Sequence, residues 1–461
     1  METNRSNRLT KMEWVFLAFC FLFYFFWAVK QPFAYAPDEG MRFEIPNYIF
    51  SRHALPSGYD EGIRVVTWGF SYAFYPCFFG PLLSALFMKL TSFFTMDFFP
   101  LVVAARMTSV LSGGLTVYFT MKISRRLFKR PYHWIMPVLT AMLPQFAFLS
   151  SYINNDVIAI MGSSVIVYAW VRGLEEWDLK SCLLLSVGVI IVALSYYNAY
   201  GWILGSIIIF ILSFYLETGS NRGMKEMWKK AAMISLLVLV CISYFFIRNA
   251  VLYNGDFLGM KSLTESSELY AMAELKPSMR NTPKNLGLSL WDMLVSPQWT
   301  GKTWLRLTYE SFIGVFGCMT VYAGNFVIFL YTVIFVTGIG GFLLSLLAAR
   351  FERRRKSGRQ EVEGAILNGL MFLCFIIPIV LSMYYSYATD YQPQGRYLAT
   401  MLVALMYFVS KGFAAIGMKL EDFAEKRLMQ GLVAVGCAAV ILTSLKVYFL
   451  TYLPSLLIPI S

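Results

Sequence analysis

Long apolar runs separated by short polar segments occupy most of the chain, from Trp14 to Leu450. Runs of about 17 to 25 residues are long enough to cross the roughly 30 Å hydrocarbon layer of a bilayer as helices. A helix satisfies its own backbone hydrogen bonds in lipid, and the alternating strands of roughly ten residues that build membrane barrels are not evident. The pattern therefore predicts an all-α membrane protein.

We expect about eleven transmembrane helices in a single domain that covers residues 1–461. The predicted spans lie near residues 13–30, 101–121, 134–152, 155–171, 181–197, 201–216, 231–247, 325–348, 365–385, 397–415 and 429–449. The apolar run that begins near residue 13 has no small-residue cleavage site after it, so we interpret it as a retained first helix rather than a signal peptide.

Composition agrees with a lipid environment, because 58% of the residues are hydrophobic and only 14% are charged. The net charge of +12 comes largely from basic segments between spans, such as Lys122–Arg130 and Arg350–Arg359. The positive-inside rule places these segments, and the N-terminus, in the cytoplasm. The charge therefore reports membrane topology, and we expect no nucleic-acid partner.

The stretch from Val65 to Leu90 is apolar enough to span, but a span there would turn both basic segments outward. Its aromatic residues and its two prolines, Pro76 and Pro81, favour a helix that lies in the membrane interface. The large outer loops then cover about residues 31–100, 248–324 and 386–396. We expect juxtamembrane helices in the first and fourth outer loops.

The first predicted helix is followed by APDEG, which places Asp38 and Glu39 where hydrocarbon meets the outer water. Two adjacent carboxylates are costly at that depth unless they are used or solvated. One of them can serve as a general base that accepts the proton of a hydroxyl acceptor. A polar turn with Pro and Gly as helix breakers explains the same residues, and both interpretations stay open.

The first outer loop continues with Glu44, His53, Tyr59 and Asp60 in an aromatic setting. Aromatic faces and carboxylates bind sugars, so these residues are candidates for sugar or acceptor binding, although an ordinary interfacial loop has the same composition. His53 has no second histidine nearby, and the cysteines lack metal-type spacing. We expect no cofactor, while a divalent metal ion stays open.

Asp156 lies in a tight outer turn, SYINNDVIAI, between two predicted spans. Asn and Asp form turns and cap helices, and this explanation is sufficient by itself. A role for Asp156 in sugar or acceptor binding is the alternative.

Two arginines stand at outer membrane boundaries, Arg248 after the seventh predicted span and Arg396 before the tenth. Arginines on that side oppose the positive-inside bias, so they call for an anionic partner. A lipid phosphate fits, because guanidinium matches phosphate oxygens in pairs. Ordinary headgroup contacts, or an ion pair with Asp38, are the alternatives. Gln392 and Gln394 precede Arg396 and are candidates for binding acceptor and donor, respectively.

The motifs in order resemble a known group. APDEG after a first helix, then FSYAFYPCFFGPL and AARMTSVLSGGLTVYFTMKISRRLF, resemble the GT-C superfamily of membrane glycosyltransferases. SSYINNDVIAIMG, FIRNAVLYNGDFLG, ESFIGVFGCMTVY and QPQGRYLATML resemble more narrowly a bacterial family of GT-C-like proteins found among cell-surface polysaccharide genes. The resemblance covers nearly the whole chain.

This resemblance implies an active site on the outer face of a bacterial plasma membrane and a polyprenyl-phosphate-linked sugar as donor. Asp38 matches an acidic residue similar to the catalytic base, with Glu39 beside it, and Arg396 with Gln394 matches the segment assigned to the donor phosphate. The soluble C-terminal domain of many GT-C enzymes, and the metal-binding carboxylates of oligosaccharyltransferases, are not evident. The acceptor, a cell-surface glycan or glycolipid, is therefore not specified.

The mechanism predicted from these residues is a single displacement that inverts the anomeric centre, with Asp38 as base and with Arg396 and Arg248 on the leaving phosphate. The alternatives are a polymerase or ligase of lipid-linked glycans, and a transporter or flippase for a lipid-linked sugar. Transporters often carry charged or broken helices at mid-membrane, whereas the ionisable residues here cluster at span ends.

Overall fold

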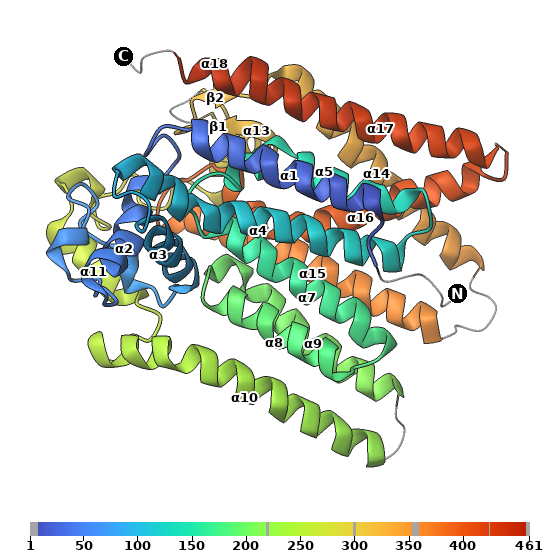
Figure 1. Cartoon of the computed structure of the whole chain (residues 1–461), viewed down its shortest axis with the longest axis horizontal. Helices are drawn as coiled ribbons and strands as arrows, with labels where there is room; N and C mark the ends of the chain where they lie inside the picture. Colours follow the sequence, from blue (N-terminus) through green and yellow to red (C-terminus); the bar gives the residue numbers. More distant parts are fainter. Residues whose placement is uncertain (1–7, 218–220, 298–300, 353–358, 424, 458–461) are drawn as a thin grey trace.

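A computed structural model describes residues 8–217, 221–297, 301–352, 359–423 and 425–457. Long helices run side by side, and most of the shorter helices gather at one end of this bundle, which we call the loop end (Figure 1). The long helices are α1 (Lys11–Lys30), α4 (Phe98–Leu127), α7 (Asp156–Glu175), α9 (Tyr200–Glu217), α10 (Asn221–Leu252), α14 (Asn325–Glu352), α15 (Arg359–Ala388), α16 (Leu402–Leu420) and α17 (Lys426–Val447).

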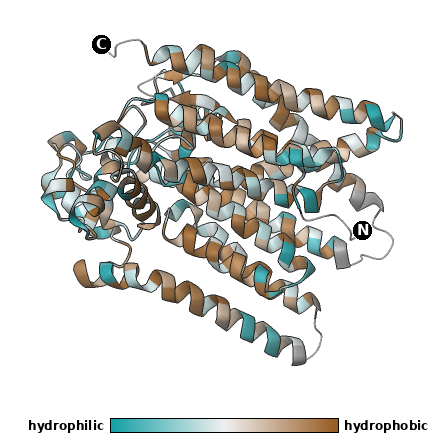
Figure 2. Cartoon of the chain, in the orientation of Figure 1, coloured by the Kyte–Doolittle hydropathy of each residue, from teal (hydrophilic) through white to brown (hydrophobic). Residues whose placement is uncertain are grey.

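Nine helices in the described part of the chain are long and apolar enough to cross a membrane. They correspond to the nine long helices above, three of them lengthened by adjoining turns. η4 (Tyr197–Ala199) precedes α9, η6 (Gly395–Met401) precedes α16, and η7 (Tyr448–Tyr452) with α18 (Leu453–Ser455) follows α17. Apolar residues cover the helix bodies and hydrophilic ones gather near their ends (Figure 2). This confirms the predicted all-α membrane architecture.

The helices differ in how much of their surface the protein itself covers. In the apolar window of α7, 89% of the residues are buried, against none in the window of α10. Leu236, Leu239 and Val240 of α10 are among the exposed large side chains. In a membrane such a helix is covered by lipid, so α7 belongs to the core of the bundle and α10 to its periphery.

The predicted count of eleven spans is not confirmed. The predicted span 134–152 is divided into η3 (Tyr132–Trp134), α5 (Ile135–Met142) and α6 (Pro144–Leu149). Leu143 is extended (φ −63°, ψ 119°), because the residue before a proline is disfavoured in the helical region. The predicted span 181–197 is the 15-residue α8 (Leu179–Ala193), which is shorter than an ordinary spanning helix.

The loop end holds the predicted juxtamembrane helices. The first outer loop forms α2 (Glu39–Arg52), η1 (Glu61–Ile63), η2 (Tyr72–Phe74) and α3 (Phe79–Thr91). The fourth outer loop forms α11 (Met260–Tyr270), η5 (Ala273–Leu275), α12 (Leu290–Val295) and α13 (Trp304–Gly314). A hairpin of β1 (Val315–Phe316) with β2 (Val321–Tyr322) follows α13. After α17 the chain ends in the π-helical turn η7 (Tyr448–Tyr452) and α18 (Leu453–Ser455).

The aromatic stretch expected to lie in the interface is helical only in its second half. Val65 and Phe70 form an isolated bridge, and α3 begins only at Phe79, after Pro76. Pro81 falls in the first turn of α3, where a missing N–H breaks no helical hydrogen bond. The prolines therefore determine where this helix starts.

Candidate active site at the loop end

Asp38 and Arg396, which lie 358 residues apart in the sequence, meet at the loop end. Nη2 of Arg396 donates a hydrogen bond to Oδ2 of Asp38 at 2.7 Å. The side chain of Arg396 is 6% exposed and that of Asp38 is 25% exposed. The ion pair is therefore withdrawn from bulk solvent, but the carboxylate remains accessible from one side. This is one of the alternatives that the sequence left open for Arg396.

The backbone holds Asp38 in an unusual conformation. Asp38 is the N-cap of α2 and has φ 61° and ψ 3°, in the left-handed region. Few residues other than glycine adopt this region without cost, and such residues are frequent at functional sites. The Asp38 carboxylate makes no capping bond to its own helix in the described structure and accepts from Arg396 instead.

Close packing against α13 places Arg396. A Cβ atom on Gly395 would lie 2.1 Å from the backbone nitrogen of Phe312, so only glycine fits. The Gly395 N–H donates to Oγ of Ser311 at 2.7 Å. The two motifs ESFIG and QPQGRY, which are far apart in the sequence, are thus joined at one point.

We expect Gly395→Ala to displace Arg396 from Asp38. The methyl group would collide with the α13 backbone, which cannot move aside as a flexible side chain can. Activity should fall at least tenfold, in line with the sensitivity of catalytic geometry to displacements of about 1 Å. Gly431→Ala is a matched control, since nothing lies within 4 Å of a Cβ atom there. Equal activity of the two variants would contradict this account.

Glu39, the second acidic residue of APDEG, is completely buried against Arg106 of α4. Its Oε1 accepts from Nε of Arg106 at 2.7 Å, and its Oε2 accepts from Nη2 at 2.8 Å. The remaining Arg106 donors bind the carbonyls of Ala28, Gln31 and Pro32. This arrangement fastens the end of α1 to the start of α2, and it gives Glu39 a structural ion pair rather than contact with a substrate.

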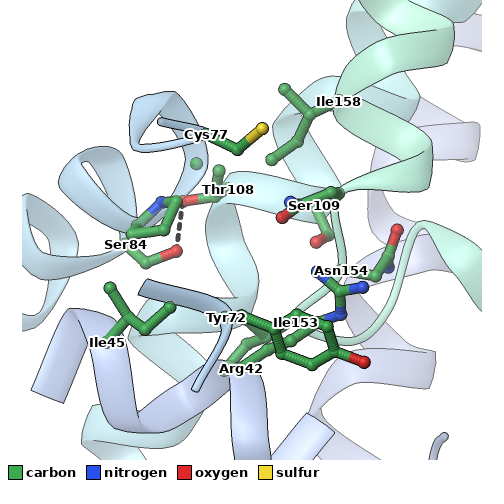
Figure 3. A pocket seen from close by; sticks show the side chains of 13 residues that line it. Arg42, Ile45, Tyr72, Cys77, Ser84, Thr108, Ser109, Ile153, Asn154 and Ile158 are labelled. Carbon is green, nitrogen blue, oxygen red and sulfur yellow. Dashed lines mark hydrogen bonds between the residues drawn. The ribbon is translucent and has the colours of Figure 1, made fainter. Parts of the chain in front are cut away.

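A second arginine and a tyrosine stand beside Asp38. Arg42 of α2 places its guanidinium carbon 4.2 Å from the centre of the Tyr72 ring. The Tyr72 side chain is also an electrostatic neighbour of Asp38. Figure 3 shows Arg42, Tyr72 and Asn154 around a cavity of about 20 Å³, enough for one water molecule.

The charges around Asp38 determine its protonation state. Burial raises the pKa of Asp38, but the nearby guanidinium groups of Arg396 and Arg42, with a smaller contribution from the Tyr72 side chain, outweigh it, so the pKa lies below its usual value. The carboxylate is therefore ionised at neutral pH. Burial raises the pKa of the Tyr72 hydroxyl well above its usual value, so Tyr72 stays protonated.

Asp156 belongs to the same cluster. It is 3% exposed, it begins α7, and its electrostatic neighbours include Arg396, Arg42 and Asp38. No ion pair of Asp156 is found among the described side chains. The carboxylate of Asp156 therefore lies within electrostatic range of the Asp38 carboxylate and of the two guanidinium groups. In the described ranges, no group of three or more His, Cys, Asp and Glu residues that could hold a metal ion is found.

The glutamines of the QPQGRY motif form a polar chain. Gln394 Nε2 donates to Gln392 Oε1 at 2.6 Å, and Gln392 Nε2 donates to Asp390 at 2.9 Å. Oε1 of Gln394 is buried and has no hydrogen-bond partner among the residues that the structure describes. Because the carboxylate of Asp390 accepts from Gln392, it orients both amides and leaves a Gln394 oxygen available to a hydroxyl donor.

The other sequence-predicted residues lie elsewhere at the loop end. Nη2 of Arg248 donates to the carbonyls of Leu55 and Pro56, and no contact joins Arg248 to Asp38 or Arg396 in the described structure. Glu44 and Asp60 line a separate hollow of about 370 Å³. His53 and Tyr59 are exposed, with the Tyr59 ring packed edge-on against that of Phe74.

Sequence reasoning missed three residues of this cluster: Arg42, Tyr72 and Asp390. Arg42 follows Asp38 by four residues, which is one helical turn, so a predicted helix after APDEG would have placed both on one face. Tyr72 and Asp390 reach the cluster through loop packing, for which the sequence carries no local signal.

The comparisons with known proteins come from structure alone. No protein-family model and no curated protein sequence matches the chain. The oligosaccharyltransferase of Archaeoglobus fulgidus in its apo form matches with a TM-score of 0.54 and 12% identity, over 94% of this chain and 55% of that one. AglB of Archaeoglobus fulgidus, in complex with an inhibitory peptide and a dolichol-phosphate, matches with a TM-score of 0.51 and 13% identity, over 95% and 55%.

The chain has a GT-C fold. This confirms the predicted GT-C-like fold. The chain spans about half the length of the oligosaccharyltransferase structures that it matches. ArnT of Cupriavidus metallidurans bound to undecaprenyl phosphate also matches, with a TM-score of 0.41 and 13% identity, over 89% of this chain and 79% of that one.

Proposed function

We propose that this GT-C chain is an inverting glycosyltransferase that moves a sugar from a polyprenyl-phosphate donor to a cell-surface glycan or glycolipid. The observation that carries the proposal is the Asp38–Arg396 pair, an ionised carboxylate held beside a guanidinium at the membrane boundary. A carboxylate accepts a proton and a guanidinium binds phosphate, which are the two tasks of this reaction.

In the proposed step, Asp38 accepts the proton of an acceptor hydroxyl while the hydroxyl oxygen attacks the anomeric carbon. The bond between that carbon and the phosphate oxygen breaks, and its electron pair leaves on the phosphate. Arg396 stabilises the charge that develops there. A phosphate is a good leaving group, so no strong general acid is required, and a single displacement inverts the anomeric centre.

The fold and the polar lining support this assignment. The matched AglB structure contains a dolichol-phosphate, a lipid-linked phosphate of the proposed class. Asp156 and the Gln392–Gln394 chain supply hydrogen-bonding groups near Arg396 that suit sugar hydroxyls. The positive-inside pattern of the sequence supports a loop end that faces the outside of a bacterial plasma membrane, with a cytoplasmic N-terminus.

The proposal is tested by reconstituting the full chain in vesicles with undecaprenyl-phosphate sugars that carry a radiolabel in the sugar, together with cell-envelope glycolipid. We expect the label to move, one sugar at a time, to the glycolipid. Growth of long labelled chains would identify a polymerase or ligase instead. Label that stays on the donor and changes leaflet would identify a flippase, and either result would overturn the proposed function.

Arg396→Ala is expected to weaken use of the donor. The variant loses a charge-assisted contact to the phosphate, which is worth roughly 1.5–3 kcal/mol, so KM for the donor should rise at least tenfold. Arg396→Lys keeps the charge and should lose less. Initial rates as a function of donor concentration measure both effects, and an unchanged dependence on donor concentration in Arg396→Ala would refute the role.

A further inference from the structure

Arg42 differs from the neighbouring arginines in what it contacts. Its backbone N–H bonds to the carbonyl of Asp38 at 2.9 Å, so its side chain starts one helical turn from the proposed base. Its guanidinium lies over the ring of Tyr72, and its Nε is buried without a hydrogen-bond partner. The described structure gives the Arg42 guanidinium neither a hydrogen bond nor an ion pair, although Asp38 and Asp156 are electrostatic neighbours.

Arg106, Arg248 and Arg396 each donate hydrogen bonds to protein groups, although Nη1 of Arg248 and Nε of Arg396 are also buried without a hydrogen-bond partner among the described residues. Arg106 directs its guanidinium donors at Glu39 and at three carbonyl oxygens. Arg248 binds two carbonyls of the first outer loop. Arg396 shares Nη2 between Asp38 and the Tyr397 hydroxyl, and Nη1 approaches the Pro37 carbonyl.

Arg42 is half-buried, and of its guanidinium nitrogens Nε is buried without a hydrogen-bond partner among the described residues. A buried donor of a charged group is costly to leave unused, and an anion would satisfy it. The ring of Tyr72 holds the charge in place but accepts no strong hydrogen bond from it. A phosphate oxygen would satisfy the guanidinium donors, since a guanidinium presents them as a planar fork that matches phosphate.

We propose that Arg42 binds a non-bridging oxygen of the donor phosphate and that it, rather than Arg248, is the second cation of the site. The inference rests on the proposed function and specifies how that site holds its substrate. Arg396 is committed to Asp38, so Arg42 provides the larger share of phosphate binding before the reaction. Arg396 also contacts the phosphate and stabilises the charge that develops on the leaving group.

Tyr72 lies beside both the proposed phosphate-binding residue, Arg42, and the proposed base, Asp38. Its ring lies against the guanidinium of Arg42, and its side chain is an electrostatic neighbour of Asp38 that lowers the pKa of Asp38. Tyr72→Leu removes the ring and should weaken phosphate binding, whereas Tyr72→Phe keeps the ring and removes only the hydroxyl. We therefore expect Tyr72→Phe to retain donor binding while it lowers the rate of transfer.

The test measures equilibrium binding of undecaprenyl phosphate, without a sugar, to the full chain purified in detergent. Binding of this probe requires no turnover, so it separates the role of Arg42 from catalysis. We expect Arg42→Ala to weaken binding about 10- to 100-fold, which is the range for a lost charge-assisted contact, and Arg42→Lys to weaken it less. Phosphatidylglycerol and inorganic phosphate, as competitors, distinguish the lipid-linked phosphate from a bulk anionic headgroup and from a free anion.

Arg64→Ala is the matched control. Arg64 is also an outer-loop arginine, and its guanidinium carbon lies 3.9 Å from the centre of the Tyr270 ring, so it repeats the stacking without Asp38 beside it. This variant should bind the probe as the wild type does. Arg248→Ala tests the assignment made from sequence, and we expect it to bind the probe more tightly than Arg42→Ala does.

Wild-type affinity in Arg42→Ala, together with weakened binding in Arg396→Ala, would overturn the inference and leave the proposed function standing. A wild-type chain that binds undecaprenyl phosphate no better than phosphatidylglycerol would remove both. Melting in detergent shows whether each variant is folded. If Arg42→Ala fails to fold, Arg42→Lys and Tyr72→Leu test the inference in its place. Binding of undecaprenyl phosphate that is unchanged in both of these variants would equally overturn the inference.

Discussion

Asp38→Asn is expected to abolish measurable sugar transfer while the protein remains folded. The amide has nearly the shape of the carboxylate and can still accept a hydrogen bond from Arg396, but it cannot take the proton of the acceptor. General-base catalysis is worth roughly 10² to 10⁴ in rate, and the variant should lose at least that factor. Transfer from the labelled undecaprenyl-phosphate sugar in vesicles measures it.

The loss should appear in kcat with little change in the apparent affinity for the donor, because Arg42 and Arg396 remain. Asp97→Asn is the matched control, since Asp97 is an exposed N-cap of α4 that makes no capping bond. Since the pKa of Asp38 lies below its usual value, the wild-type rate should depend on Asp38 protonation only in acid, below the range of an ordinary aspartate. Near wild-type transfer by Asp38→Asn would show that another group is the base.

The fold could be predicted from sequence features that extend over no more than the length of one helix. Apolar length and basic flanks predicted the membrane architecture and the interfacial character of the first outer loop, since crossing a bilayer depends on local composition. The capping box of Thr10 and Glu13 marks the start of α1 equally locally. A single residue can interrupt a helix, as Pro144 does between α5 and α6. In such a segment the length of the apolar run overestimates the length of the helix.

The candidate site was only partly predictable. The acidic and basic character of Asp38 and Arg396 at membrane boundaries indicated where charge is costly, and the structure brings the two together. The sequence could not show that the guanidinium of Arg248 donates to loop carbonyls while the guanidinium of Arg42 has no such bonds in the described structure. Both arginines lie beside similar polar segments of the outer loops. That distinction depends on which backbone oxygens the folded loops present, and it arises only from tertiary packing.

Glu39→Ala is expected to produce the largest loss of stability among the loop-end variants. The carboxylate of Glu39 and the guanidinium of Arg106 are both 0% exposed, and removal of one partner leaves the other charged and buried. Breaking such a pair costs about 3–5 kcal/mol, far more than the pair contributes relative to an apolar replacement. The melting temperature in detergent should fall by many degrees, or the variant should fail to accumulate.

Two comparisons separate this structural role from a catalytic one. Glu61→Ala breaks an exposed pair with Arg64, whose atoms are 3.5 Å apart, and should leave stability almost unchanged, as exposed ion pairs contribute little. The double variant Glu39→Leu with Arg106→Met removes both charges and should recover part of the stability lost in Glu39→Ala. A catalytic role for Glu39 would instead make Glu39→Ala inactive while it melts at the same temperature as the wild type. That result would reverse the assignment of Glu39 as the residue that fastens α1 to α2.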